Sequence, residues 1–383
     1  MPISLVGSEM CIRDSVNGTC VQDGKIMEPH KEQLAPKTKL LLFILASILL
    51  LYRYFFYMNI FNSVKKAEIH VHLEATITPT LCKKFAKRNN YEIAEEMFGS
   101  KYAYQWDDFY DFIKKYDIVT SVIHTPEDYF ELTYEYLKDC AANNVLYVEA
   151  MISSTHAKEK GMTYHSFIEG VYEASKKAEE DFGIVSRYIM NGIRHLGPES
   201  VQGTAEEVLN NPHPCLVGFG LAGDELHFPP NLFVETFDML KKENFPITVH
   251  AGEWDGPVNI RNAINLLHPT RLGHGVRSIE DPDLVKEIID KDIILETCPT
   301  SNIATKIYKD YVDHPVKTLF DQGVKVTVNS DDPPFFNATI NGEYKVMEDL
   351  GLNEKELTSL THNAIKYSFC DDENKNKLLA KLN

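Results

Sequence analysis

Two histidines stand one residue apart, at His70 and His72, inside the apolar stretch AEIHVHLEAT (67–76). Side chains alternate between the two faces of a β-strand, so both imidazoles would point the same way. Two imidazoles on one face fill an apolar core poorly but can share a metal ion. The spacing alone is weak evidence, because a chain with 14 histidines contains such a pair by chance about half the time.

Other polar residues lie at the ends of further apolar, β-rich runs. VHAGE contains His250 and Glu253, RLGHG contains His274, and VNSDDP contains Asp331 and Asp332. Each residue alone is more often a hydrogen-bonded core or surface side chain, a loop carboxylate or part of a turn. Because buried charges without partners are costly, several separate segments that each end in such a group predict a common site around a cation.

The chemistry that this cluster predicts is hydrolytic. Three imidazoles and one carboxylate around a single ion, with a position left for water, suit Zn²⁺, with iron or cobalt as alternatives. Zinc lowers the pKa of a bound water to about 7, which makes hydroxide available at neutral pH. The remaining histidines, such as His124, His156, His165, His213 and His362, lack this context and are expected to be surface or structural residues.

The elements that must position these groups alternate between strand and helix. Eight β-rich runs are predicted, at 67–72, 145–152, 185–193, 215–223, 246–253, 271–275, 293–299 and 324–332. Helical periodicity between them favours an α/β fold of the (β/α)8 TIM type, whose sites lie at the carboxyl ends of the strands. A doubly wound sheet would usually show a Gly-rich turn after its first strand, and none follows His72. The long segment 78–144 predicts extra helices inserted after the first strand.

The bulk composition narrows the class of partner. The 383 residues carry a formal net charge of −17, which argues against nucleic acid and leaves a small ligand as the expected partner. The seven cysteines are scattered and form no Cys-x-x-Cys, which indicates reduced thiols in a cytoplasmic protein. This absence also argues against a zinc site of the cytidine deaminase type.

The first 57 residues look foreign to the rest. LVGSEMCIRDS (5–15) resembles a translated sequencing-library adapter, which makes Met58 the natural start and 1–57 a non-native leader. The alternative is a signal anchor at 39–57, although its uncharged part is shorter than a bilayer span. Membrane association is expected only if 39–57 is truly expressed. Residues 58–383 are predicted to form a single barrel domain.

Residues 64–370 resemble the adenosine deaminase family of metal-dependent adenosine and adenine deaminases. The motifs that carry the resemblance occur in order: HVHLEA, Arg194–His195, GFGLAGDE, VHAGE, RLGHGVR, CPTSN and VNSDDP. It implies one Zn²⁺ per chain, with these ligands: His70, His72, His250 and Asp331.

The same resemblance implies the roles of the remaining site residues. Glu253 matches the acid that protonates N1 of the purine, and His274 matches the residue that assists the attacking water. The residues implied to contact substrate are His72, Glu74 at a ribose hydroxyl, the backbone of Gly223 at N3, and Asp332 at N7. For this chemistry Glu253 must be neutral, whereas Asp331 must stay ionised.

The motifs differ in whether they favour adenosine or adenine as the substrate. Glu74–Ala75 and Met151 replace the Asp–Gly and Arg that are usual in adenosine deaminases, and NSDDPPFF also leans toward adenine. LAGDE and RLGHG match the nucleoside enzymes and flank the purine, so adenosine, with deoxyadenosine, is the expected substrate, in purine salvage. Adenine is the alternative substrate. A non-catalytic, membrane-anchored nucleoside sensor is the alternative of another class.

Overall fold

The computed structural model describes residues 4–5, 10–13, 20–22, 25–27 and 60–382, and it divides into two compact units, Met1–Asn59 and Ile60–Asn383. Four short strands of the first unit pair antiparallel in chain order: β1 Ser4–Leu5, β2 Met10–Arg13, β3 Cys20–Gln22 and β4 Lys25–Met27. The proposed anchor at 39–57 lies outside the described residues, and the leader stays a prediction. No helix in the described part of the chain is both long and apolar enough to cross a bilayer.

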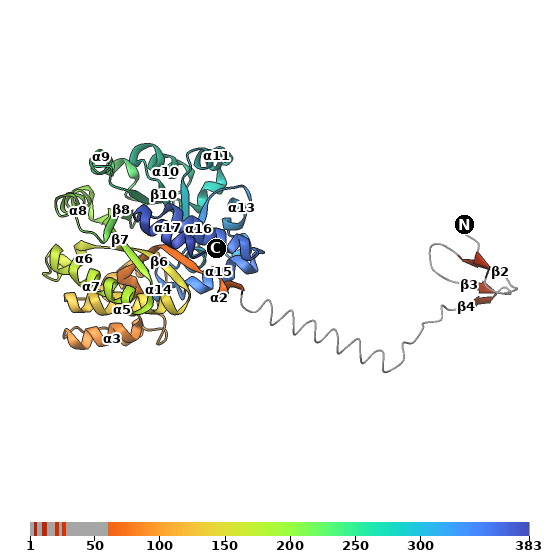
Figure 1. Cartoon of the computed structure of the whole chain (residues 1–383), viewed down its shortest axis with the longest axis horizontal. Coiled ribbons are helices and arrows are strands. Elements are labelled where there is room, and N and C mark those ends of the chain that lie inside the picture. Colours follow the sequence, from red (N-terminus) through yellow and green to blue (C-terminus); the bar gives the residue numbers. More distant parts are fainter. Residues whose placement is uncertain (1–3, 6–9, 14–19, 23–24, 28–59, 383) are drawn as a thin grey trace. The chain divides into compact units, whose positions relative to one another are not determined.

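The second unit is built on eight parallel strands that neighbour one another in chain order, with helices around them (Figure 1). They are β5 Lys66–His72, β6 Val145–Ile152, β7 Val185–Ile193, β8 Leu216–Ala222, β9 Ile247–Ala251, β10 Arg271–His274, β11 Ile294–Thr297 and β12 Val326–Val328. Each strand falls on one of the predicted runs. The predicted TIM-type barrel is therefore confirmed.

The barrel closes between β12 and β5 through a few specific bonds. The backbone N–H of His72 donates to the carbonyl of Asp331 at 3.0 Å, and that of Asp331 donates to the carbonyl of His70 at 3.3 Å. Two residues before Asp331, the side-chain oxygen of Asn329 accepts a hydrogen bond from the backbone N–H of Ile69 at 3.0 Å. This seam places Asp331, three residues after the end of β12, directly beside both histidines of β5.

Helices connect the strands, as the alternating pattern predicts. Between β5 and β6 lie η1 Leu73–Thr76, α3 Pro79–Arg88, η2 Glu95–Met97, α4 Phe109–Thr120 and α5 Pro126–Ala142. The later connections are α6 Ser154–Glu159, α7 Tyr164–Phe182, η3 Arg194–Leu196, α8 Pro198–Asn210, η4 Pro230–Phe233, α9 Val234–Lys242, α10 Pro257–Asn262, η5 Ala263–Leu267, η6 Val276–Glu280, α11 Pro282–Asp290, α12 Pro299–Ala304, η7 Tyr311–Asp313 and α13 Val316–Asp321. α2 Ile60–Ser63 precedes β5, and α14 Pro333–Phe336, α15 Ile340–Asp349, α16 Glu354–Tyr367 and α17 Asp372–Ala380 follow β12.

The helices inserted after β5 form a layer on one side of the barrel (Figure 1). α5 begins at a capping box in which Thr125 and Asp128 bond each other's backbone, a strong start signal. Arg88 of α3 pairs with the buried Asp128 at 2.7 Å, which ties α3 to α5, and α5 in turn packs on α7. α4 packs against η1, directly after β5.

The barrel interior contains a buried ionic network beside its apolar core. Arg271, at the start of β10, pairs through Nη1 with Glu149 at 2.6 Å and through Nε with Glu296 at 2.6 Å, and all three side chains are fully buried. The guanidinium also faces the ring of Phe369 at 3.7 Å. A backbone N–H bond from Phe369 to Glu149 brings the segment after α16 under the same end of the barrel. The network links β6, β10, β11 and the C-terminal segment.

Replacing Arg271 by methionine tests the energetic weight of this network. Arg271→Met keeps most of the volume but leaves Glu149 and Glu296 without a counter-charge, so the free energy of unfolding should fall by about 3–5 kcal/mol. Arg261→Met is the matched control, because Arg261 is partly exposed where it pairs with Asp281, and it should cost no more than about 1 kcal/mol. Denaturant unfolding of both variants measures the difference. Equal costs would contradict the assigned role of the network.

Candidate active site and metal centre

A cavity opens at the carboxyl ends of the strands, where a barrel of this type carries its chemistry. Its apolar wall comes largely from the inserted α4 and consists of Phe109, Phe112, Ile113, Tyr116, Ile193, Leu196 and Phe336. Its polar floor consists of His72, His250, Glu253, His274, Asp331 and Asp332. The predicted insertion therefore supplies much of the wall around the predicted polar cluster.

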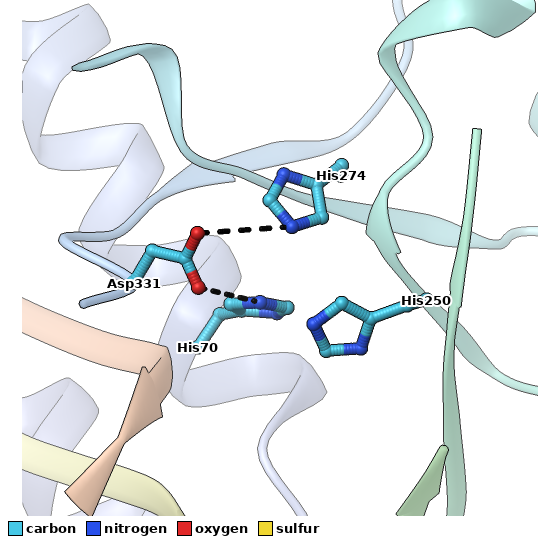
Figure 2. Close-up of side chains that lie close together, drawn as sticks. All are labelled: His70, His250, His274 and Asp331. Atoms are coloured by element: carbon cyan, nitrogen blue, oxygen red, sulfur yellow. Dashed lines mark ion pairs between the residues drawn. The ribbon is translucent and has the colours of Figure 1, made fainter. Parts of the chain in front are cut away.

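Three side chains of the floor and the buried His70 beside it converge on one point. Ligand atoms of His70, His250, His274 and Asp331 all lie within 4.8 Å of one another. Figure 2 shows the Asp331 carboxylate facing two of these rings, with Oδ1 at 3.5 Å from Nε2 of His70 and Oδ2 at 3.9 Å from Nε2 of His274. His72 approaches the same carboxylate, with its Nε2 at 3.5 Å from Oδ1, and groups with Asp331 and Asp332. The structure thus contains a buried His/His/His/Asp metal site.

Backbone conformation and a small residue make this convergence possible. His274 and Asp331 both adopt left-handed conformations, with φ of 58° and 62°, which non-glycine residues rarely do outside constrained sites. Gly273 must lack a side chain, because a Cβ there would lie 2.8 Å from Cε1 of His70 and 3.1 Å from the ring of His250. The glycine of the RLGHG motif therefore leaves the space that two imidazoles fill.

The orientation of His70 is set from the barrel interior. Its Nδ1 lies 2.8 Å from Oε2 of Glu296, and since a carboxylate only accepts, Nδ1 carries the proton and donates. Burial opposes ionisation of Glu296, but the charge of Arg271 and the bond from His70 outweigh it and lower its pKa. The network below the site therefore leaves the Nε2 lone pair of His70 free, the arrangement typical of a metal-bound histidine.

The donor set fits a cation. Nε2 of His70 is buried and has no hydrogen-bond partner among the described residues. Burial alone would lower the pKa of His70, yet Asp331 and Glu296 raise it to about 10, so the cavity strongly favours positive charge at this position. Burial lowers the pKa of His72 to about 4 and that of His250 well below its usual value, which leaves both rings neutral with lone pairs to offer. Imidazole and carboxylate together match the donors of divalent transition-metal sites.

Glu253 stands at the edge of the cluster in a very different environment from Asp331. Its Oε2 lies 3.5 Å from Nε2 of His274. Burial, reinforced by the charges of Asp331 and Glu225, raises the pKa of Glu253 well above its usual value. Asp331 is also buried, but His70, whose Nε2 lies 3.5 Å from Oδ1, and the other imidazole neighbours lower its pKa. Glu253 is thus held toward its neutral form, whereas Asp331 is held toward its anionic form.

The loop that carries Glu253 is held by a second carboxylate. Glu225, which is 2% exposed, accepts from the backbone N–H groups of Gly252, Trp254 and Asp255. Arg277 holds the opposite side of the loop, because its Nη1 donates to the carbonyl of Trp254 at 2.6 Å. The GDE sequence at 223–225 marks this segment, but nothing in the sequence indicates that Glu225 would fold back onto the HAGE loop.

Asp332 and Gly223 lie at the cavity as well. Oδ1 of Asp332 is buried without a hydrogen-bond partner among the described residues, and burial next to Asp331 raises its pKa well above the usual value. Gly223 has a φ of 102°, and a Cβ there would come within 2.6 Å of Nδ1 of His195. Only glycine can therefore present its backbone at this point of the wall.

Glu74 is placed differently from the expectation that it contacts substrate. It is 1% exposed and is not among the described residues that line the cavity. Its Oε1 accepts from the backbone N–H of Ser153 at 2.9 Å and lies 3.5 Å from the hydroxyl of Tyr129. The longer glutamate side chain reaches the end of β6 and binds there, so this placement does not support the expected ribose contact.

The sequence does not predict the position of several residues that line the cavity. His156, expected to be structural, lines the cavity 3.7 Å from Asp117 of α4. Burial lowers the pKa of His156, but Asp117 and Glu74 outweigh it and raise the pKa overall. Aromatic residues of α4 also line the cavity, whereas the sequence predicts only that their segment is helical. No local signal distinguishes them, because their approach to the cavity depends on how α4 packs over the barrel.

Comparison with known proteins agrees with this geometry. The model of the adenosine deaminase family matches residues 65–383. An adenine deaminase of Rhizobium leguminosarum bv. trifolii is 40% identical over 320 residues, which cover 83% of this chain and 99% of the relative. The crystal structure of an adenine deaminase from Arthrobacter aurescens superposes with a TM-score of 0.78 at 28% identity, covering 84% of this chain and 98% of that one.

A zinc-bound amidohydrolase of Burkholderia ambifaria has the same fold, with a TM-score of 0.77 at 24% identity over 84% of this chain and 90% of that one. The match of the family to more than half of the chain, together with the buried His/His/His/Asp site, settles the identity at the level of family and reaction class. The chain belongs to the adenosine deaminase family and is a metal-dependent hydrolase that deaminates purines.

Proposed function

We propose that this chain converts adenine and water into hypoxanthine and ammonia. The observation that carries the proposal is that the relatives named adenine deaminase match nearly their whole length to this chain. The sequence analysis favours adenosine, and the relatives favour its alternative. The purine base, rather than the nucleoside, is therefore the proposed substrate.

The environment of Glu74 supports the same choice. An enzyme that binds a nucleoside must offer the ribose hydroxyls hydrogen bonds in place of those that they lose to water. A buried polar group left unpaired costs about 1–3 kcal/mol. Glu74, the residue expected to offer such a hydrogen bond, instead bonds the N–H of Ser153 outside the cavity lining. Outside the polar floor the lining holds more aromatic and aliphatic side chains than polar ones, which suits a flat base.

We propose zinc as the metal, held by His70, His72, His250 and Asp331. These residues offer three nitrogen donors and one oxygen donor, a set that zinc favours in catalytic sites. When bound, the metal would supply an acidified water as the nucleophile.

The remaining groups handle protons and orient the ring. Attack of water at C6 breaks the aromaticity of the purine and moves an electron pair to N1. Glu253, kept neutral by burial, donates its proton there. The C6–N bond then breaks, and the amino group leaves as ammonia with one proton of the attacking water. The other proton of that water restores neutral Glu253, and hypoxanthine retains the proton on N1. The backbone N–H of Gly223 is assigned to N3 and Asp332 to N7.

A non-catalytic nucleoside sensor is the weaker alternative. It depends on the segment 39–57, which lies outside the described residues, and it offers no reason for an acidic Glu253 beside His274.

The first test compares two substrates with the zinc-loaded chain. Because no partner for ribose hydroxyls is assigned, kcat/KM for adenine should exceed that for adenosine by about ten- to a hundredfold. Steady-state release of ammonia measures both rates, with chelator-treated protein as the control. A higher value for adenosine would overturn the choice of base, and turnover of neither adenine, adenosine nor deoxyadenosine would overturn deamination itself.

The second test removes the proposed acid. Glu253→Gln keeps the shape of the side chain but cannot transfer a proton, so kcat should fall by about 10²- to 10⁴-fold with zinc content unchanged. Glu235→Gln, which makes the same change on the exposed face of α9, should keep the wild-type rate. Wild-type turnover by Glu253→Gln would exclude it as the acid.

The third test measures zinc binding through the stability of the protein and needs no measurement of activity. Zinc at 1,000 times its dissociation constant should raise the free energy of unfolding by about 4 kcal/mol, because only the folded chain assembles the site. His70→Ala should abolish this rise, whereas His165→Ala, at a histidine whose side chain is 81% exposed, should retain it. Thermal or denaturant unfolding with and without zinc measures the effect. An undiminished rise in His70→Ala would remove His70 from the ligand set.

A further inference from the structure

His274 makes a buried contact on the side of its ring that faces away from the metal site. Its Nδ1 lies 3.2 Å from Nδ2 of Asn302, and Oδ1 of the same amide lies 3.0 Å from Nε2 of His314. The three side chains are 0–3% exposed. They form a single file of hydrogen-bonding groups that begins at α13 and ends at the cavity.

The donor and the acceptor of each hydrogen bond in this file follow from the bond that His314 makes with the backbone. The backbone N–H of Val316 points at Nδ1 of His314 at 3.2 Å, and a backbone N–H can only donate. Nδ1 of His314 must therefore carry a lone pair, and the proton of this neutral ring sits on Nε2. Burial agrees with a neutral ring, because it lowers the pKa of His314 to about 3.

The proton on Nε2 of His314 determines which way the amide of Asn302 is turned. Nε2–H of His314 donates to an oxygen, which identifies the near atom of the amide as Oδ1 and leaves Nδ2 facing His274. Turning the amide over would place an NH₂ group against the Nε2–H of His314. Because Nδ2 donates, Nδ1 of His274 must accept, and the proton of the neutral His274 ring lies on Nε2.

We propose that Asn302 and His314 are positioning residues that hold His274 as the Nε2–H tautomer, which makes His274 a hydrogen-bond donor at the reacting centre and excludes it from the metal ligands. A protonated nitrogen has no lone pair for a metal, so the close approach of His274 to Asp331 does not make it a ligand. The third imidazole is then His72. This deepens the proposed function and rests on it only for the kinetic test.

The assigned tautomer explains where His274 points. Nε2 faces the cavity, 3.5 Å from Oε2 of Glu253 and 3.9 Å from Oδ2 of Asp331. A fixed N–H at this position donates toward the oxygen that attacks C6, where negative charge must be stabilised. Such preorganised donors are worth about 10²- to 10³-fold in rate.

The direct test is the ¹⁵N NMR spectrum of the full-length chain labelled at histidine, first without metal and then with one equivalent of zinc. His274 is assigned by the signal lost in His274→Gln, and one-bond couplings report which ring nitrogen carries the proton. The expected result is a proton on Nε2 of His274 in both states. A proton on Nδ1, or loss of the Nε2 proton when zinc binds, would overturn the proposal whether or not the enzyme is active.

Asn302→Asp tests the assigned cause. A carboxylate accepts from both neighbours, so His274 should switch to the Nδ1–H tautomer, and kcat for adenine should fall about 100-fold while KM changes less than about threefold. Asn231→Asp makes the same change at an exposed position and should leave the tautomer and rate unchanged. An unchanged tautomer in Asn302→Asp would overturn the proposal.

His314→Phe provides a second variant in which ring volume is kept but the donor to Asn302 is lost. The amide of Asn302 can then turn over, so both tautomers of His274 should appear in the spectrum. A single, unchanged Nε2–H tautomer would refute the role of His314. If wild-type protein shows Nε2–H but deaminates no purine, the proposed function fails while the tautomer assignment stands.

Discussion

The buried pair between Arg271 and Glu296 is the interaction on which the site depends. A carboxylate in the middle of a barrel is costly unless a cation and hydrogen-bond donors surround it. Arg271 supplies the cation, and Thr248 and His70 supply donors. Glu296 can therefore stay ionised and orient the first imidazole of the metal site. The same guanidinium binds Glu149 and faces Phe369, so one charge supports both the geometry of the site and the packing of the C-terminal segment on the barrel.

The carboxyl groups of the cavity show how position alone assigns different chemistry to similar side chains. Asp331 lies among imidazoles and is held as an anion, whereas burial and the negative charge of Asp331 raise the pKa values of Glu253 and Asp332. An anion serves a metal, and a neutral acid serves a proton transfer. The reaction needs both within a few ångströms, which explains the density of acidic residues on this floor.

Hydrogen-bond direction adds a second layer of control. Two imidazoles of the cluster differ in which nitrogen carries the proton, because one donates through Nδ1 to Glu296 and the other accepts at Nδ1 from Asn302. The first arrangement leaves a lone pair at Nε2 and the second leaves a donor there. The partners of the outer nitrogen thus divide the histidines into proposed ligand and proposed donor, although the rings lie only 5.0 Å apart by centroid.

The sequence by itself determined the barrel and the floor of its cavity. The period-two run at 67–72 and the polar residues at strand ends are local patterns, and parallel strands bring their carboxyl ends together whatever the helices do. Tertiary structure alone decided that Glu74 bonds Ser153 instead of lining the cavity, that α4 and His156 form its wall, and that Glu225 holds the loop of Glu253. These contacts join residues distant in the chain through side-chain reach and helix packing, which no local pattern encodes. For the same reason the spacing of the histidines predicted a metal site, but only the packing of α12 and α13 against it showed which nitrogen of His274 carries the proton.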